Sequence, residues 1–146
     1  MLGMPFSPPN PDPIVMNIQT GEVSRAQPHI GRLTRLGIAA AERGKGLELL
    51  KEISALIFGG TRDWHLGNHL DEAVVRSGLD LAELDRDIET NAARDEASIA
   101  GNEAAQQYAG HWGVPLMAFE GEPFFGQDRL EALKWRMAQK GLRRRG

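Results

Sequence analysis

Residues typical of β-strands gather in one short stretch of this chain, GVPLMAFEGEPFF at 113–125. Two strands are predicted there, at about 116–120 and 122–126, joined through Glu120-Gly121-Glu122. A lone hairpin is marginally stable in water, so it needs further strands or a covering helix. The chain is therefore predicted to be a mainly α protein of the α+β class, in which the residues before the hairpin form helices.

Helical periodicity fills the residues before the hairpin. One apolar period runs through 30–40 and a second through 47–57, with a break at 44–46 and an end at Gly59-Gly60. A short third helix is expected over about 66–77. These spacings indicate a helical domain with an apolar core.

Two further helices are predicted before the hairpin. Asp80 and Glu83 have the spacing of a capping box, so a helix is expected from Leu81 to about Glu89. An alanine-rich helix follows at about 92–109, and its thin apolar stripe suits packing against a neighbour. A last helix is expected after the hairpin.

Prolines at five positions between 5 and 13 exclude a helix at the start of the chain. This stretch is predicted to lie extended over a surface as a connector. The expected organisation is a connector at 1–23, an all-helical insertion domain at 24–110, and a segment at 111–146 that carries the hairpin and the last helix.

Charge and composition exclude several function classes. The 146 residues carry a net charge of -3, which gives no overall attraction to nucleic acid or to an anionic membrane. No secretory leader pattern is visible, and no apolar run reaches the ~20 residues of a membrane span. A cytoplasmic location is the expectation. Because there is no cysteine, this chain has no disulfide, thiolate zinc site or redox CxxC pair of its own.

Histidines and aromatic residues give weaker signals. His65 and His69 share a helix face, with Asp71, Glu72 and His111 as conceivable further metal ligands. That spacing is common, so no metal site is predicted. Large aromatic side chains without a basic groove are expected in the core or in a pocket wall: Trp64, Trp112, Trp135, Phe124 and Phe125.

A glycine-valine-proline step followed by strand, turn, strand and helix resembles the C-terminal ββα half of a thioredoxin fold. More narrowly, GVPLMAFEGEPFFGQDRLEALKWRM at 113–137 is similar to the end of the DsbA-like family that contains 2-hydroxychromene-2-carboxylate isomerase and the kappa-class glutathione transferases. LGMPFSPPNPDP at 2–13 resembles the loop entering that family's helical insertion, and 35–41 resembles its first long helix. The resemblance covers nearly the whole chain.

The resemblance implies a glutathione site at two points of the hairpin. A cis bond before Pro115 would turn the Val114 backbone outward to pair with the cysteinyl part of glutathione, and such a bond costs only about 0.5–1 kcal/mol more than trans. Gly126, Gln127, Asp128 and Arg129 would meet its γ-glutamyl end at a helix start. Two plainer interpretations remain: Pro115 begins an edge strand, or Asp128 only stabilises a helix N-terminus by ~0.3–1 kcal/mol.

The chain also departs from the family pattern. Relatives carry a serine in a first βαβ unit that hydrogen-bonds the glutathione thiolate, and no residue here matches it, so no catalytic residue is predicted. Leu116 stands where many relatives carry threonine. Three explanations of the absent unit stay open: it is truncated, encoded upstream or supplied by another chain.

Two function classes follow from this resemblance. The first is a glutathione-dependent isomerase or transferase acting on a small aromatic or electrophilic substrate. The second is a non-catalytic module that dimerises or binds a peptide. In either class the two-stranded sheet needs partners, so a homo-oligomer is expected.

Overall fold

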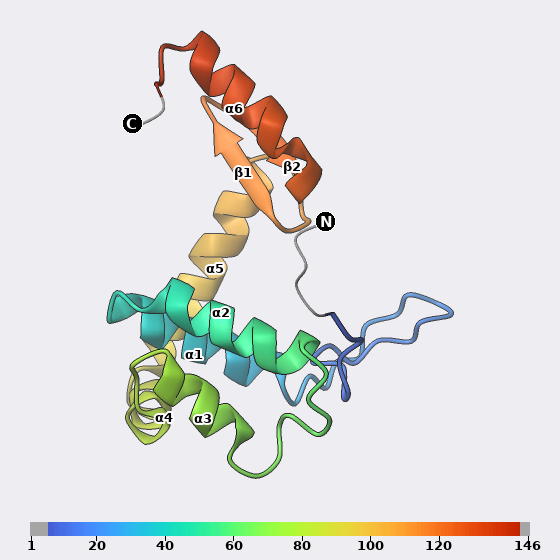
Figure 1. Cartoon of the computed structure of the whole chain (residues 1–146), viewed down its shortest axis with the longest axis vertical. Coiled ribbons are helices and arrows are strands. Elements are labelled where there is room, and N and C mark those ends of the chain that lie inside the picture. The colour runs from blue at the N-terminus through green and yellow to red at the C-terminus, as the bar shows by residue number, and fades with distance from the viewer. Residues whose placement is uncertain (1–5, 144–146) are drawn as a thin grey trace. The chain divides into compact units, whose positions relative to one another are not determined.

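A computed structural model describes residues 6–143 and divides the chain into two compact units, Met1–Asp95 and Glu96–Gly146. We call them the helical unit and the hairpin unit, and each is described by itself. Helices dominate, and the one sheet of the described residues has two antiparallel strands (Figure 1). The predicted mainly α, α+β fold class is confirmed, whereas the predicted domain boundaries stay a prediction.

Four helices lie wholly within the helical unit: α1 (Ile30–Glu42), α2 (Gly46–Phe58), α3 (His69–Arg76) and α4 (Leu81–Thr90). A fifth, α5 (Ala92–Tyr108), begins in this unit and continues into the next. The predicted helices are confirmed. The third starts three residues later than expected, because the chain turns at Gly67 with a φ of 59° that a helix cannot contain.

The core of the helical unit draws on all four helices and on one loop tryptophan. Leu36 of α1, Leu49 of α2 and Trp64 are almost fully buried. Further buried residues pack with them: Ala39, Ala40, Ile53, Leu56, Ile57, Leu70, Ala73, Val74 and Leu84. Burial of this apolar surface stabilises the unit without any contribution from a sheet.

Residues 7–13 of the proline-rich stretch are non-helical and lie along the helical unit, as predicted. The Ser7 amide donates to the Phe58 carbonyl at 2.7 Å, and the Trp64 indole Nε1 donates to the Pro11 carbonyl at 2.7 Å. The two bonds attach this stretch to residues on either side of the turn that follows α2. Residues 1–5, where the expected connector starts, lie outside the described residues.

The predicted cap of α4 is present. Asp80 is extended, and its carboxylate accepts the Glu83 amide at 2.9 Å. An acidic side chain at this position satisfies one of the free N–H groups of the first turn. The cap therefore fixes where α4 begins.

A buried carboxylate marks the start of α5. Asp95 is fully buried, and Arg94 donates to its Oδ1 at 2.8 Å and to Asp87 Oδ2 at 2.8 Å. The hydrogen bond from Arg94 lowers the pKa of Asp87, and Arg43 adds to the effect. The prediction of a packed apolar stripe on α5 is wrong within this chain. Its members are exposed: Ala97, Ala100, Ala104, Ala105 and Tyr108.

The hairpin unit contains β1 (Leu116–Phe119), β2 (Glu122–Phe125) and α6 (Leu130–Gln139), which follows a 3₁₀ turn, η1 (Gln127–Arg129). Leu116 pairs with Phe125, and Phe119 pairs with Glu122. The two-residue turn has φ of 50° at Glu120 and 80° at Gly121, the signs that a type I′ hairpin turn requires. The predicted hairpin is confirmed to within one residue at each strand end.

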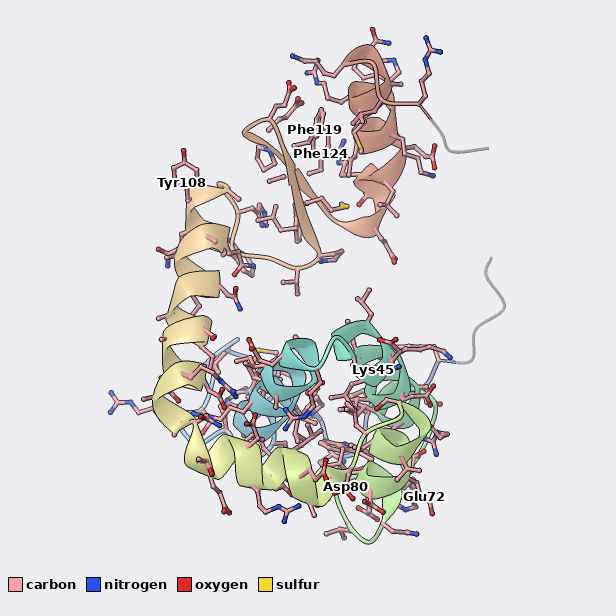
Figure 2. The ribbon with its side chains drawn as sticks, turned by 90° about the vertical axis from the view of Figure 1, so that its left-hand side faces the viewer. Lys45, Glu72, Asp80, Tyr108, Phe119 and Phe124 are labelled. Atoms are coloured by element: carbon pink, nitrogen blue, oxygen red, sulfur yellow. The ribbon has the colours of Figure 1, made fainter. Side chains whose placement is uncertain are left out.

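One face of the hairpin packs against α6. Phe124 is buried, and Figure 2 shows Phe119 and Phe124 between the strands and this helix. Arg136 donates to Glu122 at 2.6 Å and Lys140 lies 2.7 Å from Glu120, so ion pairs tie the helix to the turn.

The core or pocket-wall expectation is right for Trp64 and Phe124, which are buried, and for Phe125, which lines a hollow. It is wrong for Trp112 and Trp135, which are exposed. The hairpin unit is small, with one helix on one face of the hairpin, so it has little interior space for large aromatic rings. None of the helices in the described residues is long and apolar enough to span a membrane.

Candidate functional site

The two halves of the predicted site lie side by side at one end of the hairpin. Gly126 donates its amide to the Pro115 carbonyl at 3.0 Å, directly after the last strand pair, Leu116 with Phe125. The Val114-Pro115 peptide bond is cis, which confirms the prediction. The turn from β2 into α6 therefore lies beside the residues that precede β1.

Val114 is open to solvent at this point. Its side chain and backbone are 79% exposed, and within residues 6–143 no group hydrogen-bonds to its N–H or C=O. Backbone groups that are exposed and unpaired at a strand end can accept another extended chain. The structure thus gives Val114 the property that the resemblance implied.

Gly126 has a positive φ, which residues with a side chain adopt only at a cost in free energy. Its φ is 94°, and a Cβ at this position would lie 2.5 Å from Asp128 Oδ1. The glycine therefore lets the Asp128 carboxylate lie close over the main chain.

Asp128 is not used as a helix cap. Its side chain is 76% exposed, its nearest cation is Arg129 with Nε 3.6 Å from Oδ2, and the 3₁₀ turn has no side-chain cap. The Gln127 and Asp128 amides donate to no described residue. A carboxylate beside two free amides can bind an ammonium and a carboxylate together, which are the charges of an amino acid end.

Two further residues, which the sequence did not assign to the site, hydrogen-bond to the loop that precedes Val114. His111 Nδ1 accepts the Gly113 amide at 2.8 Å. Gln106 of α5 donates to the carbonyls of Trp112 at 2.9 Å and Gly113 at 3.2 Å. His111 stands two residues before the Gly113-Val114-Pro115 motif, and this closeness in sequence could have indicated its role. No such indication exists in the sequence for Gln106, because its contact with the loop depends on where α5 ends.

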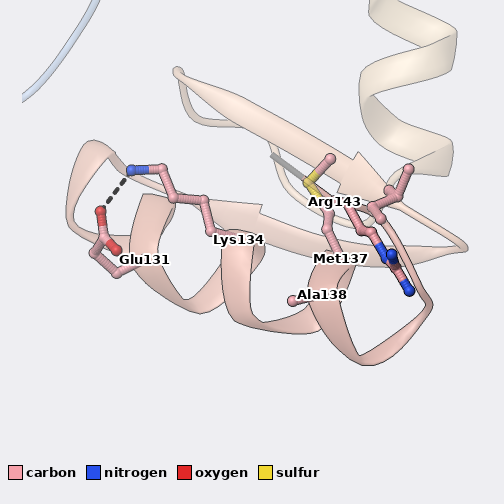
Figure 3. Close-up of a pocket in the computed structure, with 6 residues that line it drawn as sticks. Glu131, Lys134, Met137, Ala138 and Arg143 are labelled. Carbon is pink, nitrogen blue, oxygen red and sulfur yellow. Dashed lines mark hydrogen bonds and ion pairs between the residues drawn. The ribbon is translucent and has the colours of Figure 1, made fainter. Parts of the chain in front are cut away.

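Two hollows of the hairpin unit lie along α6, and one of them adjoins the site. One of about 400 Å³ runs along β2 and the start of α6, and Arg129 lines it together with Pro123 and Phe125. A larger one of about 510 Å³ runs along α6 and is lined by Glu131, Met137 and Arg143 (Figure 3). The larger hollow includes none of the predicted site residues.

No three histidine or acidic side chains gather to hold a metal ion in the described part of the chain. Of the candidates weighed from sequence, His65 contacts His29, with ring centroids 4.7 Å apart, and lies edge-on to Trp64. His111 is engaged by its own loop. The assignment of glutathione-binding roles to Val114, Pro115, Gly126, Gln127, Asp128 and Arg129 stays a prediction.

Comparison with known proteins gives one match. No curated protein and no solved structure matches the chain. The family model of the DSBA-like thioredoxin domain matches residues 19–138, which is most of the chain and includes the cis-proline hairpin. The chain therefore belongs to the DSBA-like thioredoxin domain family.

Proposed function

We propose that this chain supplies half of the glutathione site of a glutathione-dependent isomerase or transferase of the 2-hydroxychromene-2-carboxylate isomerase type. The observation that carries the proposal is the exposed, unpaired Val114 backbone, held beside Gly126 and Asp128 by the Gly126 to Pro115 hydrogen bond. Family membership supports a fold of this kind, and the site geometry supports the ligand.

Each end of glutathione has a partner in this arrangement. The cysteinyl main chain pairs with the Val114 N–H and C=O as a short added strand. The ammonium of the γ-glutamyl end binds the Asp128 carboxylate, and its α-carboxylate accepts from the free Gln127 and Asp128 amides. Arg129 lies next to this end and adds positive charge for the carboxylate.

The chemistry in this proposal belongs to the glutathione thiol, which acts as nucleophile or conjugating group on a small aromatic or electrophilic substrate. Residues 1–146 contain no counterpart of the serine that stabilises the thiolate in relatives. Activity then requires a hydroxyl from outside these residues. We place the protein in the cytoplasm, where the site would meet glutathione.

Self-association is part of the proposal. The sheet of the described residues has two strands, and both of its outer edges lack a strand partner. An unpaired edge is a template for another strand. Sedimentation should show a dimer or larger species at micromolar concentration; a stable monomer with a protected hairpin would contradict this.

Titration with glutathione, followed through backbone amide NMR signals, tests the ligand. Half a site should bind with a millimolar Kd, and the Val114 and Gln127 amides should shift. Because Asp128 is exposed, Asp128→Asn should weaken binding by about 1 kcal/mol, roughly fivefold. Glu131→Gln, which changes an exposed carboxylate in the first turn of α6, is the matched control and should leave binding unchanged.

The alternative is a non-catalytic module that binds an extended peptide at Val114. It is favoured by the missing thiolate-stabilising hydroxyl. Turnover of an aryl chloride with glutathione separates the two functions. Rates typical of enzymes from residues 1–146 alone would refute the argument from the missing serine, whereas binding unchanged by Asp128→Asn would remove Asp128 from the site.

A further inference from the structure

Two side chains hold the backbone that leads into Val114. Gln106 donates to both the Trp112 and Gly113 carbonyls, at 2.9 and 3.2 Å. His111 accepts the Gly113 amide at 2.8 Å. The polar groups just before Val114 are thus bonded to side chains, while those of Val114 itself are left open to solvent.

Ring stacking ties the same segment to the sheet. The His111 imidazole lies on the Phe125 ring with centroids 3.8 Å apart and planes 15° apart. Phe125 is fixed in turn by its pairing with Leu116. A Cβ on Gly113 would collide with the Phe125 ring, so the backbone passes this stack as closely as it can. The stack holds the His111 ring, and with it the Nδ1 acceptor, beside the Gly113 amide.

The Gly113 hydrogen bond fixes the protonation of His111. An N–H can donate to Nδ1 only when Nδ1 carries a lone pair, so the imidazole is neutral with its proton on Nε2. An imidazolium carries N–H groups on both nitrogens and would oppose the Gly113 N–H. Histidine changes charge between about pH 5 and 8 in proteins, within the range of cellular compartments.

Aromatic rings and one polar side chain of α5 surround this part of the loop. The faces of the His111 ring are covered by Phe125 from β2 and by Trp112 from its own loop. From α5 the nearest polar contact to this loop is the Gln106 amide, which is occupied by the two carbonyls. In the described part of the chain, the polar partner of the His111 ring is the Gly113 amide. Protonation would therefore remove this contact with the Gly113 amide.

We propose that Gln106 and His111 are positioning residues that present the Val114 backbone, and that His111 does so only as a neutral imidazole, so that acid releases the segment. This inference rests on the proposed function for its ligand, because the released backbone is the one expected to pair with glutathione. The device would make capture of an extended ligand strongest at neutral to alkaline pH.

The first experiment follows the ligand-free protein by NMR from pH 8 to pH 5. The His111 ring nitrogens should report the Nε2–H tautomer at pH 8, and the Gly113 amide should lose its hydrogen-bonded shift as the ring protonates. Exchange of the Val114 and Gly113 amides with solvent, corrected for the intrinsic pH effect, should rise in step. Amides that do not respond to His111 protonation would overturn the proposal.

Three variants separate positioning from simple packing. His111→Asn keeps an acceptor near the Nδ1 position but does not titrate, so the segment should stay ordered down to pH 5. His111→Phe keeps the stack on Phe125 without an acceptor, so the segment should be released at every pH. His69→Gln, a histidine of the helical unit, is the control and should leave the response unchanged. Retention of the wild-type pH response in His111→Asn would also overturn the proposal.

A ligand experiment links the switch to the site. From pH 8 to pH 5 glutathione should lose about 2- to 12-fold more affinity for the wild type than for His111→Asn, the worth of one neutral hydrogen bond. Glutathione itself titrates equally in both experiments, so the comparison of wild type with His111→Asn removes that contribution. If glutathione binds at no pH while the loop responds as above, the proposed function fails and the positioning role stands. Equal pH dependence of binding in both proteins would refute the role of His111 in capture.

Discussion

The two units of this chain are stabilised in different ways. The helical unit buries side chains from four helices around Leu36, Leu49 and Trp64. The hairpin unit buries Phe124 and otherwise relies on a tight turn, on ion pairs such as Arg136 with Glu122, and on side-chain bonds to loops. The difference indicates that the helical unit carries the stability, while the hairpin unit carries the exposed backbone that a ligand or partner can use.

Local opening should follow the same division. Regions with few buried apolar contacts open at a lower free energy than the global one. We therefore expect the hairpin to exchange its amides faster than the core helices. Each of the following substitutions alters one unit, so its effect on the other unit tests this division.

The largest effect is expected from a cavity in the helical core. Leu49 and Leu47 lie on the same helix, α2, and are 1% and 81% exposed. Leu49→Ala should lower the free energy of unfolding by ~2–5 kcal/mol. Leu47→Ala should stay within about 0.5 kcal/mol of wild type. Thermal and denaturant unfolding measure both; equal losses would contradict the core as described.

Removal of the buried ring of the hairpin unit should act locally. Phe124→Ala is expected to abolish exchange protection of the β1 and β2 amides, because no other buried side chain in that unit's described residues holds the strands against α6. The melting of α1 to α4 should hardly change. Hydrogen exchange resolved by residue is the measurement, and loss of protection in the core helices would show that the two units unfold together.

The cap of α4 offers a smaller change within the helical unit. Asp80→Ala removes the acceptor of the Glu83 amide and should cost about 1 kcal/mol. Asp80→Asn keeps an oxygen in place and should retain most of the stability. Both variants are compared by chemical denaturation, and a full loss in Asp80→Asn would mean that charge and not capping is responsible.

Acid should weaken the helical unit through Asp87. Its pKa lies below the ordinary 3.8 because of the hydrogen bond from Arg94. A lowered pKa in the folded state means that the stabilisation is present above about pH 4 and is lost as the pH falls through the folded value. Asp87→Asn should flatten the unfolding free energy below pH 4 and lower it at neutral pH. Acid profiles of wild type and variant that run parallel would contradict this sign.

Local signals in the sequence accounted for most of the fold. The periods of α1 and α2 and the cap at Asp80 are set by residues three or four apart, and the hairpin is set by Glu120 and Gly121 in its turn. Such features depend on neighbours in the chain, so they can be predicted without knowledge of the tertiary structure.

Features that depend on distant contacts could not be predicted. The buried face of α5 contains Asp95 and not the alanine stripe, because Arg94 pairs with the Asp95 carboxylate and is itself held by Asp87 of α4. Gln106 supports the candidate site only because α5 stops close to the loop before β1. The proline step and the glycine before η1 were visible in sequence, whereas these supports were not.

The burial of Trp64 has a spectroscopic consequence. Its indole is enclosed in the helical unit with Nε1 bonded to the Pro11 carbonyl, while Trp112 and Trp135 of the hairpin unit are exposed. Trp64 should therefore emit at shorter wavelength and resist quenching by iodide, and the other two should emit like free indole and be quenched readily. Trp64 is therefore a built-in reporter of the helical unit: its emission should move to longer wavelength and become quenchable when that unit unfolds, without any added label.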